Sequence, residues 1–312
     1  MTAEGGSDLH LSTSSFRGDK NLAFEAFLLG TDDGGARDGA GGLRLDYPND
    51  RWDVALNWRQ IGDRFQPALG FVPRAGIRTT DVSFAFQPRP QSWGIRQFFF
   101  EANPVAVTDL RNRLQSASVS TTPLNVQTES GDHLEWDYVP QFEHLDVPFE
   151  VASGVAISPG SYRWTQTRLQ VDTATKRPWV INAMWSTGGF YDGRLRQFSL
   201  TATAKAGPHV AVSAHAEQDA GTLPEGRFTK EILTLGADCN VTPNLSWSTL
   251  AQYDNVSSIV GVQSRIRWIV QPGNDLFVVV NRGWLRLEDG DGARFEPLFD
   301  QASLKFQYTL RF

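Results

Sequence analysis

The chain has little of what marks a helical membrane protein, a disulfide-stabilised domain or a nucleic-acid-binding protein. A single cysteine, Cys239, among 312 residues excludes a disulfide within the chain. No stretch approaches 18 consecutive apolar residues, so the sequence contains no transmembrane helix. The net charge of −6 argues against a nucleic-acid partner. Helical periodicity is nearly absent, and short alternating segments separated by turn residues predict an all-β protein.

Signals for export and for cofactor chemistry are also missing. The first eight residues, Met-Thr-Ala-Glu-Gly-Gly-Ser-Asp, contain neither a basic region nor an apolar core, so they are not a signal peptide. The chain has no phosphate-binding loop, dinucleotide fingerprint or nucleophile elbow, and its five histidines have no metal-ligand spacing. The densest acid–histidine group is Glu143, His144 and Asp146, which we interpret as charges at a strand end. We therefore expect no cofactor and no metal site.

The last stretch of the chain alternates without a break. Residues Leu304, Phe306, Tyr308, Leu310 and Phe312 share one face of a predicted strand, and polar residues lie between them. An apolar closing strand that ends on an aromatic residue resembles the assembly signal of outer-membrane barrels. Lys305, Leu310 and Phe312 match that signal, whereas Gln307 stands where glycine is usual.

About seventeen strands are predicted from the alternation and the turn residues. They span residues 8–17, 21–31, 41–48, 51–62, 77–87, 93–107, 114–128, 133–145, 162–173, 179–190, 194–205, 209–218, 228–241, 245–254, 259–270, 275–286 and 301–312. A shift of apolar phase between Trp164 and Leu169 predicts a β-bulge in 162–173.

The connections between these strands fall into two alternating sets. One set is short and rich in Pro, Gly, Asn and Asp. The other set contains the long connections at 32–40, 63–76, 146–161, 219–227 and 287–300. Short turns at one end and longer loops at the other are typical of outer-membrane barrels. The sequence therefore predicts an antiparallel transmembrane β-barrel of about 16–18 strands that fills residues 1–312 as a single domain.

Charged residues fall on the strand faces opposite the apolar ones. Such charges are costly toward lipid and tolerable toward a wet lumen, so we expect Glu135, Asp137, Arg265 and Arg267 to face the lumen. Glu135 and Asp137, two residues apart on one strand, also have the spacing of a paired-carboxylate site.

The segment from Arg64 to Arg74 is the best candidate for a functional loop. It is long, lies on the long-loop side and combines aromatic and aliphatic residues with two arginines. The residues that would form a constriction of the lumen are Arg64, Phe65, Leu69, Phe71 and Arg74. The alternative interpretation is a loop that packs on its neighbours.

Several motifs together resemble one bacterial family. The motifs include residues 64–74, Pro159 to Trp164, Gly188 to Gly193 and Arg265 to Trp284. The chain is similar to the carboxy-terminal outer-membrane barrel of a family of unknown function. Members of that family carry an amino-terminal carbohydrate-binding module of the family-9 type. The resemblance implies a location in the cell outer membrane and a link to carbohydrate. It implies no catalytic residues.

Three hypotheses for function remain open. The first is an outer-membrane barrel that acts as a pore or a surface platform linked to carbohydrate binding or uptake. Its partners would be outer-membrane lipid, the barrel-assembly machinery and carbohydrate, with no nucleic acid. The second is a carbohydrate-active hydrolase that uses Glu135 and Asp137. The third is a soluble all-β binding protein.

The strand count bears on the extent of the barrel. Seventeen strands with the carboxy-terminus at the short-turn end put the amino-terminus at the opposite end. Bacterial single-chain barrels normally have an even number of strands. We therefore expect that the first strands of the barrel are missing and that this chain is the carboxy-terminal part of a longer protein.

Overall fold

A computed structural model of the chain describes residues 2–34, 37–67, 70–289 and 292–309, and these residues form strands and connections without a helix. The strands are β1 (Thr2–Phe16), β2 (Lys20–Asp33), β3 (Arg37–Pro48), β4 (Trp52–Ile61), β5 (Ile77–Phe86), β6 (Ile95–Phe98), β7 (Phe100–Asp109), β8 (Leu114–Thr128), β9 (His133–Leu145), β10 (Phe149–Ala152), β11 (Val155–Ile157), β12 (Gly160–Asp172), β13 (Trp179–Phe190), β14 (Gly193–Ala206), β15 (Val210–Leu223), β16 (Gly226–Thr242), β17 (Leu245–Asp254), β18 (Ile259–Gln271), β19 (Asn274–Asp289) and β20 (Gly292–Gln307). The all-β prediction is confirmed.

All strands except β10 and β11 belong to one antiparallel sheet. Each strand pairs with the next one along the chain, with β5 passing to β7 and β9 passing to β12. The same pattern continues without interruption from β12 to β20. Only Phe99 separates β6 from β7, so the two segments occupy one position in the 18-stranded sheet. The wall therefore has the number of positions that the alternation predicts.

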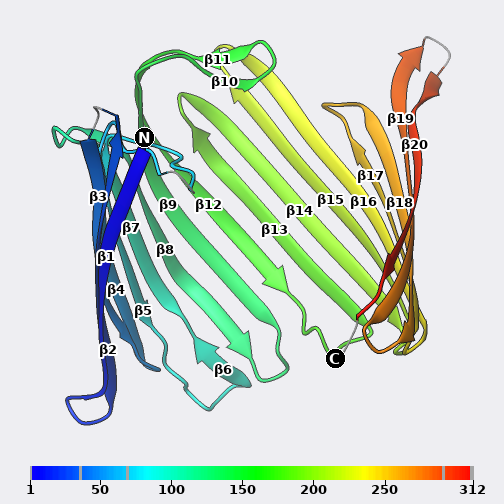
Figure 1. Ribbon diagram of the computed structural model, residues 1–312, viewed down its shortest axis with the longest axis horizontal. Coiled ribbons are helices and arrows are strands. Elements are labelled where there is room, and N and C mark those ends of the chain that lie inside the picture. Colours follow the sequence, from blue (N-terminus) through cyan, green and yellow to red (C-terminus); the bar gives the residue numbers. More distant parts are fainter. Residues whose placement is uncertain (1, 35–36, 68–69, 290–291, 310–312) are drawn as a thin grey trace.

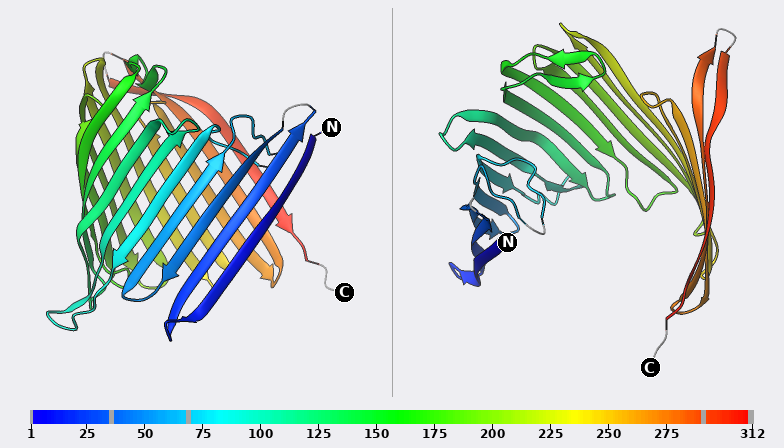
Figure 2. Two further views of the ribbon diagram at one scale, coloured as in Figure 1. Left: turned by 90° about the vertical axis from the view of Figure 1, so that its left-hand side faces the viewer. Right: turned by 45° about the horizontal axis from the view of Figure 1, so that its top comes forward.

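The sheet curves like the wall of a barrel and is open between its first and last strands. Figure 1 shows β1 and β2 on one side and β19 and β20 on the other, and Figure 2 shows the same separation from two further directions. Within the described residues, β1 pairs only with β2, and β20 pairs only with β19. The barrel wall is thus formed, and these two strands are its edges.

The two sets of connections lie at opposite ends of the wall, as predicted. β1 begins at the same end as the β10–β11 hairpin, and β20 runs toward the other end (Figure 1). Three of the predicted long loops are wrong, because the flanking strands extend into 32–40, 219–227 and 287–300 and pair with each other there. The alternation of apolar and polar residues is weak in these segments, because strand ends that extend past the apolar part of the convex face need no apolar side.

Two other predictions about strands need correction. The ladder between β12 and β9 runs from Gly160 to Asp172 without a register shift, so the bulge expected in β12 is absent. The apolar phase changes because Trp164 lies on one face of β12, packed on Tyr191, while Leu169 lies on the other. The last strand begins earlier than predicted, at Gly292, and is assigned as strand to Gln307.

The convex face of the sheet carries large apolar side chains across its width, with the ion pair between Arg282 and Asp300 as a charged exception. Cross-strand partners on this face include Leu45 with Leu56, Trp185 with Phe198, and Ile266 with Val278. Large exposed side chains on it are Leu43, Leu56, Trp185, Leu233, Leu235, Trp247, Ile266 and Leu304. Because period two places alternate residues on opposite faces, the residues between them point to the concave side.

Aromatic side chains gather on the convex face toward the short-turn end. Trp52 lies 4.3 Å from Phe86 between ring centroids, and Phe86 lies 6.3 Å from Phe100. Phe306 and Tyr308 stack at 6.3 Å on the last strand. Aromatic rings at the edge of an apolar band are typical of the interfacial girdles of membrane barrels.

A small hairpin, β10–β11, interrupts the meander at the long-loop end. It pairs only with itself and places Val155 and Ile157 against Leu223 of β15 in the most buried cluster of the described residues. Tyr162 and Phe228, from the concave sides of β12 and β16, also pack on this cluster. The hairpin therefore covers the concave face at one end of the wall, where it was predicted only as part of a loop.

Candidate functional site

Three rows of mostly polar side chains cross the concave wall; they begin on β7, β8 and β9, and all end on β16. They arise because the antiparallel register places inward-pointing residues of successive strands directly opposite one another. The first polar row is Glu101, Thr122, Asp137, Arg168, Ser186, Gln197, Asp219 and Lys230. The second is Asn125, Glu135, Gln170, Met184, Ser199, Glu217 and Ile232. The third is His133, Asp172, Asn182, Thr201, His215 and Thr234.

Arg168 joins the first and second polar rows. Its Nε donates to Asp137 Oδ2 at 2.7 Å, and one terminal nitrogen donates to Glu135 Oε1 at 3.1 Å. The hydroxyl of Thr122 donates to the other oxygen of Asp137 at 2.7 Å. Asp137 is only 1% exposed. One guanidinium thus compensates two carboxylates, and this group is the centre of the candidate site.

Further hydrogen bonds continue around this centre. Asn125 Nδ2 donates to Glu135 at 2.9 Å, and its Oδ1 lies 2.8 Å from His133 Nε2. The other ring nitrogen of His133 lies 3.1 Å from Asp172, to which Asn182 also donates at 2.8 Å. Both nitrogens of His133 are therefore engaged in the wall. The predicted placement of Glu135 and Asp137 on one face, away from the apolar residues, agrees with this network.

The geometry gives the hydrolase hypothesis no support. A glycosidase needs one carboxylic acid that can protonate a leaving group and a second that attacks or activates water. Asp137 is buried beneath Arg168 and Thr122, and Glu135 shares the same guanidinium. Within the described residues, no group of three or more His, Cys, Asp or Glu side chains could hold a metal ion.

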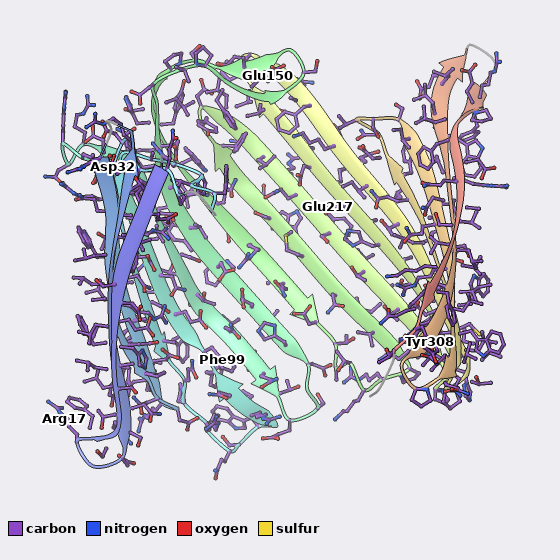
Figure 3. All side chains as sticks on the ribbon, in the orientation of Figure 1. Arg17, Asp32, Phe99, Glu150, Glu217 and Tyr308 are labelled. Atoms are coloured by element: carbon purple, nitrogen blue, oxygen red, sulfur yellow. The ribbon has the colours of Figure 1, made fainter. Side chains whose placement is uncertain are left out.

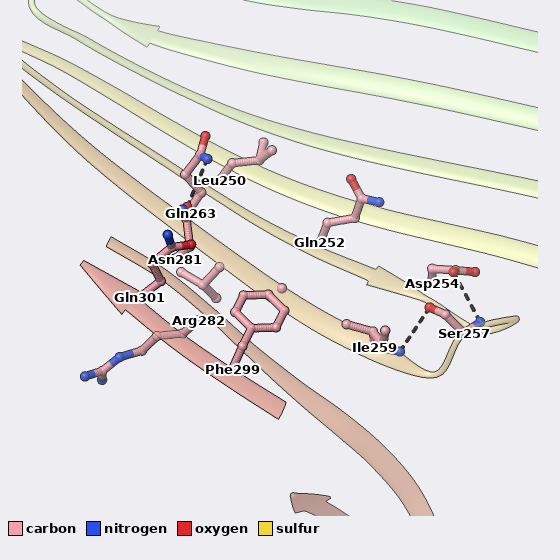
Figure 4. Close-up of a pocket in the computed structure, with 12 residues that line it drawn as sticks. Leu250, Gln252, Asp254, Ser257, Ile259, Gln263, Asn281, Arg282, Phe299 and Gln301 are labelled. Atoms are coloured by element: carbon pink, nitrogen blue, oxygen red, sulfur yellow. Dashed lines mark hydrogen bonds between the residues drawn. The ribbon is translucent and has the colours of Figure 1, made fainter. Parts of the chain in front are cut away.

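A second feature is a hollow of about 470 Å³ on the concave side of β17–β20. Three of the side chains that line it, the amides of Gln263, Asn281 and Gln301, lie opposite one another on three adjacent strands, and Leu250, Ile259 and the carboxylate Asp254 line it as well. Gln263 Nε2 donates to Asn281 Oδ1 at 3.0 Å, as the dashed line in Figure 4 shows. Phe299 adds a ring, and Arg282 extends away from the hollow toward the other face (Figure 4). The hollow thus combines amide hydrogen-bonding groups with several apolar side chains and the carboxylate of Asp254.

The structure separates the residues predicted for a loop constriction. Phe65 is buried, Phe71 is exposed, and the backbone nitrogen of Arg64 donates to Asp38 at 2.7 Å. Arg74 reaches the wall, where it donates to the buried amide of Gln115 at 3.3 Å. Leu69 lies outside the described residues. The described part of the loop is therefore anchored to β3 through Arg64 and to β8 through Arg74.

The other predicted residues lie at the last strands. Arg265 stands opposite Ser248, and Arg267 pairs with Asp275 at 3.0 Å. Lys305 lies opposite Phe277. Leu310 and Phe312, the rest of the predicted assembly signal, fall outside the described residues. Because Ile266, between the two arginines, belongs to the convex face, Arg265 and Arg267 point to the concave side.

Sequence reasoning missed an aromatic cluster at the long-loop end. The ring of Tyr191 lies 4.8 Å from Trp164, 5.2 Å from Tyr162 and 4.9 Å from Phe190. Two of the motifs that carry the family resemblance, 159–164 and 188–193, thus meet in space. The signal available in the sequence was the spacing of two residues from Tyr162 through Trp164 and Gln166 to Arg168. In a strand this spacing places the two aromatic rings on the same face as Arg168.

Comparison with known proteins adds no family assignment. No helix of the described residues is long and apolar enough to cross a membrane. No protein-family model matches the chain, and no curated protein sequence is significantly similar to it. The resemblance drawn from the motifs therefore stays a prediction.

Proposed function

We propose that the protein is an outer-membrane β-barrel that conducts small polar solutes. The observation that carries this proposal is the division of the sheet into a convex apolar face and a concave face with the three polar rows. In lipid, backbone groups must be satisfied within the protein, and an antiparallel barrel wall satisfies them between strands. Charges on the concave side are tolerable only if water reaches them.

The exposed apolar area favours this proposal over a soluble binding protein. Soluble monomers rarely expose a contiguous apolar patch larger than a few hundred Å². Here exposed Leu, Trp and Ile side chains extend across the convex face from β3 to β20. The aromatic side chains at the short-turn end fit an interfacial belt. Outer-membrane lipid is the partner that this face suits, and the barrel-assembly machinery would insert the protein.

Sugars are the first solutes to test. The hollow of Figure 4 presents the amides of Gln263, Asn281 and Gln301 beside Phe299. Amides donate and accept hydrogen bonds with hydroxyl groups, and an aromatic ring covers apolar carbon surface. This supports the link to carbohydrate that the motif resemblance implies.

Four measurements test the proposal. The protein should fractionate with outer membranes and migrate faster on a gel before heating than after it. In planar bilayers it should produce discrete conductance steps, and vesicles that contain it should swell in isotonic solutions of small sugars. Recovery in the soluble fraction without detergent would contradict the proposal. Membrane insertion without conductance or swelling would contradict the pore hypothesis and favour the surface-platform hypothesis.

A further inference from the structure

The charges of the polar rows are unevenly balanced. Setting the histidines aside, the three rows hold the acids Glu101, Glu135, Asp137, Asp172, Glu217 and Asp219. Their only bases are Arg168 and Lys230. The three polar rows between β7 and β16 therefore carry a surplus of negative charge.

Both bases are engaged away from the acids of β15. Arg168 binds Asp137 and Glu135 on β9. Lys230 donates to the carbonyl oxygen of Val151 in the β10–β11 hairpin at 3.0 Å and lies over the ring of Phe228. Lys230 thus hydrogen-bonds to the β10–β11 hairpin and forms no ion pair with Asp219, although the two residues stand opposite each other in the register.

Glu217 and Asp219 remain as uncompensated carboxylates. Figure 3 labels Glu217 near the middle of the wall formed by β13–β16, and its side chain is 44% exposed. The His215 ring nitrogen Nε2 lies 3.6 Å from a carboxylate oxygen of Glu217, while Asp219 accepts a hydrogen bond from the neutral amide of Gln197 at 3.0 Å. No Lys or Arg within the part of the chain that the structure describes lies within ion-pair distance of either carboxylate. The arginines Arg265 and Arg267 belong to β18, toward the short-turn end.

We infer that the lumen selects cations over anions and that Glu217 and Asp219 are its specificity-determining residues. A cleft that carries one sign of charge between low-dielectric walls raises the local concentration of the opposite ion. Mobile cations would then accumulate in the part of the lumen next to Glu217 and Asp219, and anions would be depleted from it. This inference rests on the proposed pore and adds the charge of the ions that pass.

The experiment measures reversal potentials of the protein in planar bilayers under a steep KCl gradient. The wild-type potential should lie on the side of the K⁺ equilibrium potential. The double variant Glu217→Gln, Asp219→Asn should lower the ratio of cation to anion permeability by roughly twofold or more, because the local field weakens. The matched control, Glu129→Gln in the exposed turn after β8, removes one charge outside the rows and should leave the ratio unchanged.

The outcomes separate the two proposals. A reversal potential at zero, or on the Cl⁻ side, would overturn the inference while the pore stands. A double variant with wild-type selectivity would overturn the assignment to these two residues. Absence of conductance in protein that shows heat-modifiable mobility would overturn the pore and the inference together.

Discussion

At the residue scale, the buried carboxylate of Asp137 connects neighbouring strands of the wall. Asp137 is 1% exposed, and a charge taken out of water is tolerated only when it is paired and hydrogen-bonded. Thr122, Arg168 and the register that brings β8, β9 and β12 together supply those partners. Through Thr122 and Arg168, the Asp137 carboxylate therefore links β8, β9 and β12 on the concave face.

Removal of Arg168 should therefore cost more than removal of another inward arginine. Arg168→Met leaves Asp137 without a cation, and we expect a loss of roughly 2–4 kcal/mol, below the usual value for a fully buried pair because Arg168 is half-exposed. Urea unfolding of the protein in detergent micelles measures this. The matched control, Arg265→Met opposite Ser248, should change stability by about 1 kcal/mol or less. Equal losses in the two variants would contradict the role of the Asp137 pair.

A second carboxylate lies outside the strands, in the turn between β8 and β9. Asp132 accepts hydrogen bonds from the Ser130 hydroxyl at 2.7 Å, the Ala174 backbone nitrogen at 3.0 Å and Arg177 at 2.6 Å. These contacts, the Ser130 bond foremost, lower the pKa of Asp132 to about 2. The contacts with Ala174 and Arg177 tie this turn to the neighbouring turn between β12 and β13.

This pKa predicts an acid-sensitive connection between the two turns. Because the folded pKa lies below the ordinary value of 3.8, the stabilisation is present above about pH 4 and is lost as the pH falls through about 2. Asp132→Asn should be less stable than wild type at neutral pH, and the difference should shrink between these values. Thermal unfolding of both proteins across this range measures it. A difference that stays constant down to the lowest pH would refute the linkage.

At the scale of the element, each strand presents two environments, one on each face. Ile266 is 43% exposed on the convex face, while its neighbours Arg265 and Arg267 point inward. A one-residue slip would exchange every such pair, so the alternation fixes the register. The β10–β11 hairpin follows a different rule, because it is held by the burial of Val155 and Ile157 rather than by pairing with the sheet.

Introducing one arginine on each face of β18 tests the assignment of faces. Ile266→Arg should destabilise the protein by roughly 2–4 kcal/mol in lipid, because arginine in the middle of the lipid face of a barrel is costly. Gln263→Arg adds the same side chain on the concave side and should be mild. Arg267→Gln should also cost less than Ile266→Arg. Reversible unfolding from lipid vesicles gives the three values, and the reverse order would mean that the faces are exchanged.

At the scale of the molecule, the open edges are the unusual feature. β1 and β20 each leave one row of backbone groups without a strand partner within the described residues. Both strands run from the long-loop end to the short-turn end (Figure 1). Direct pairing of these edges would therefore be parallel, unlike every other pairing in the sheet.

The carboxy-terminal strand should also determine whether the whole chain is inserted. If Phe312 belongs to an assembly signal, its deletion should lower the amount of inserted protein far more than the amount synthesised. Phe312→Tyr, which keeps an aromatic ring, serves as the control and should insert nearly normally. Quantification of membrane and total protein after a short pulse measures both. Wild-type insertion of the deleted chain would remove the assembly-signal hypothesis.

The sequence alone determined the strands and their faces. Four strands, 114–128, 133–145, 179–190 and 245–254, have the predicted bounds, because alternation with period two and turn residues are local signals. The alternation also separated Ile266 from Arg265 and Arg267.

Tertiary structure decided what depends on long-range register. The meeting of Asp137 with Arg168, 31 residues later, depends on which residues of β9 and β12 stand opposite each other. The same holds for the amides of the hollow, and for Lys230, which bonds the hairpin instead of Asp219. The opening between β1 and β20 depends on curvature accumulated over the whole sheet, which no local pattern of residues specifies.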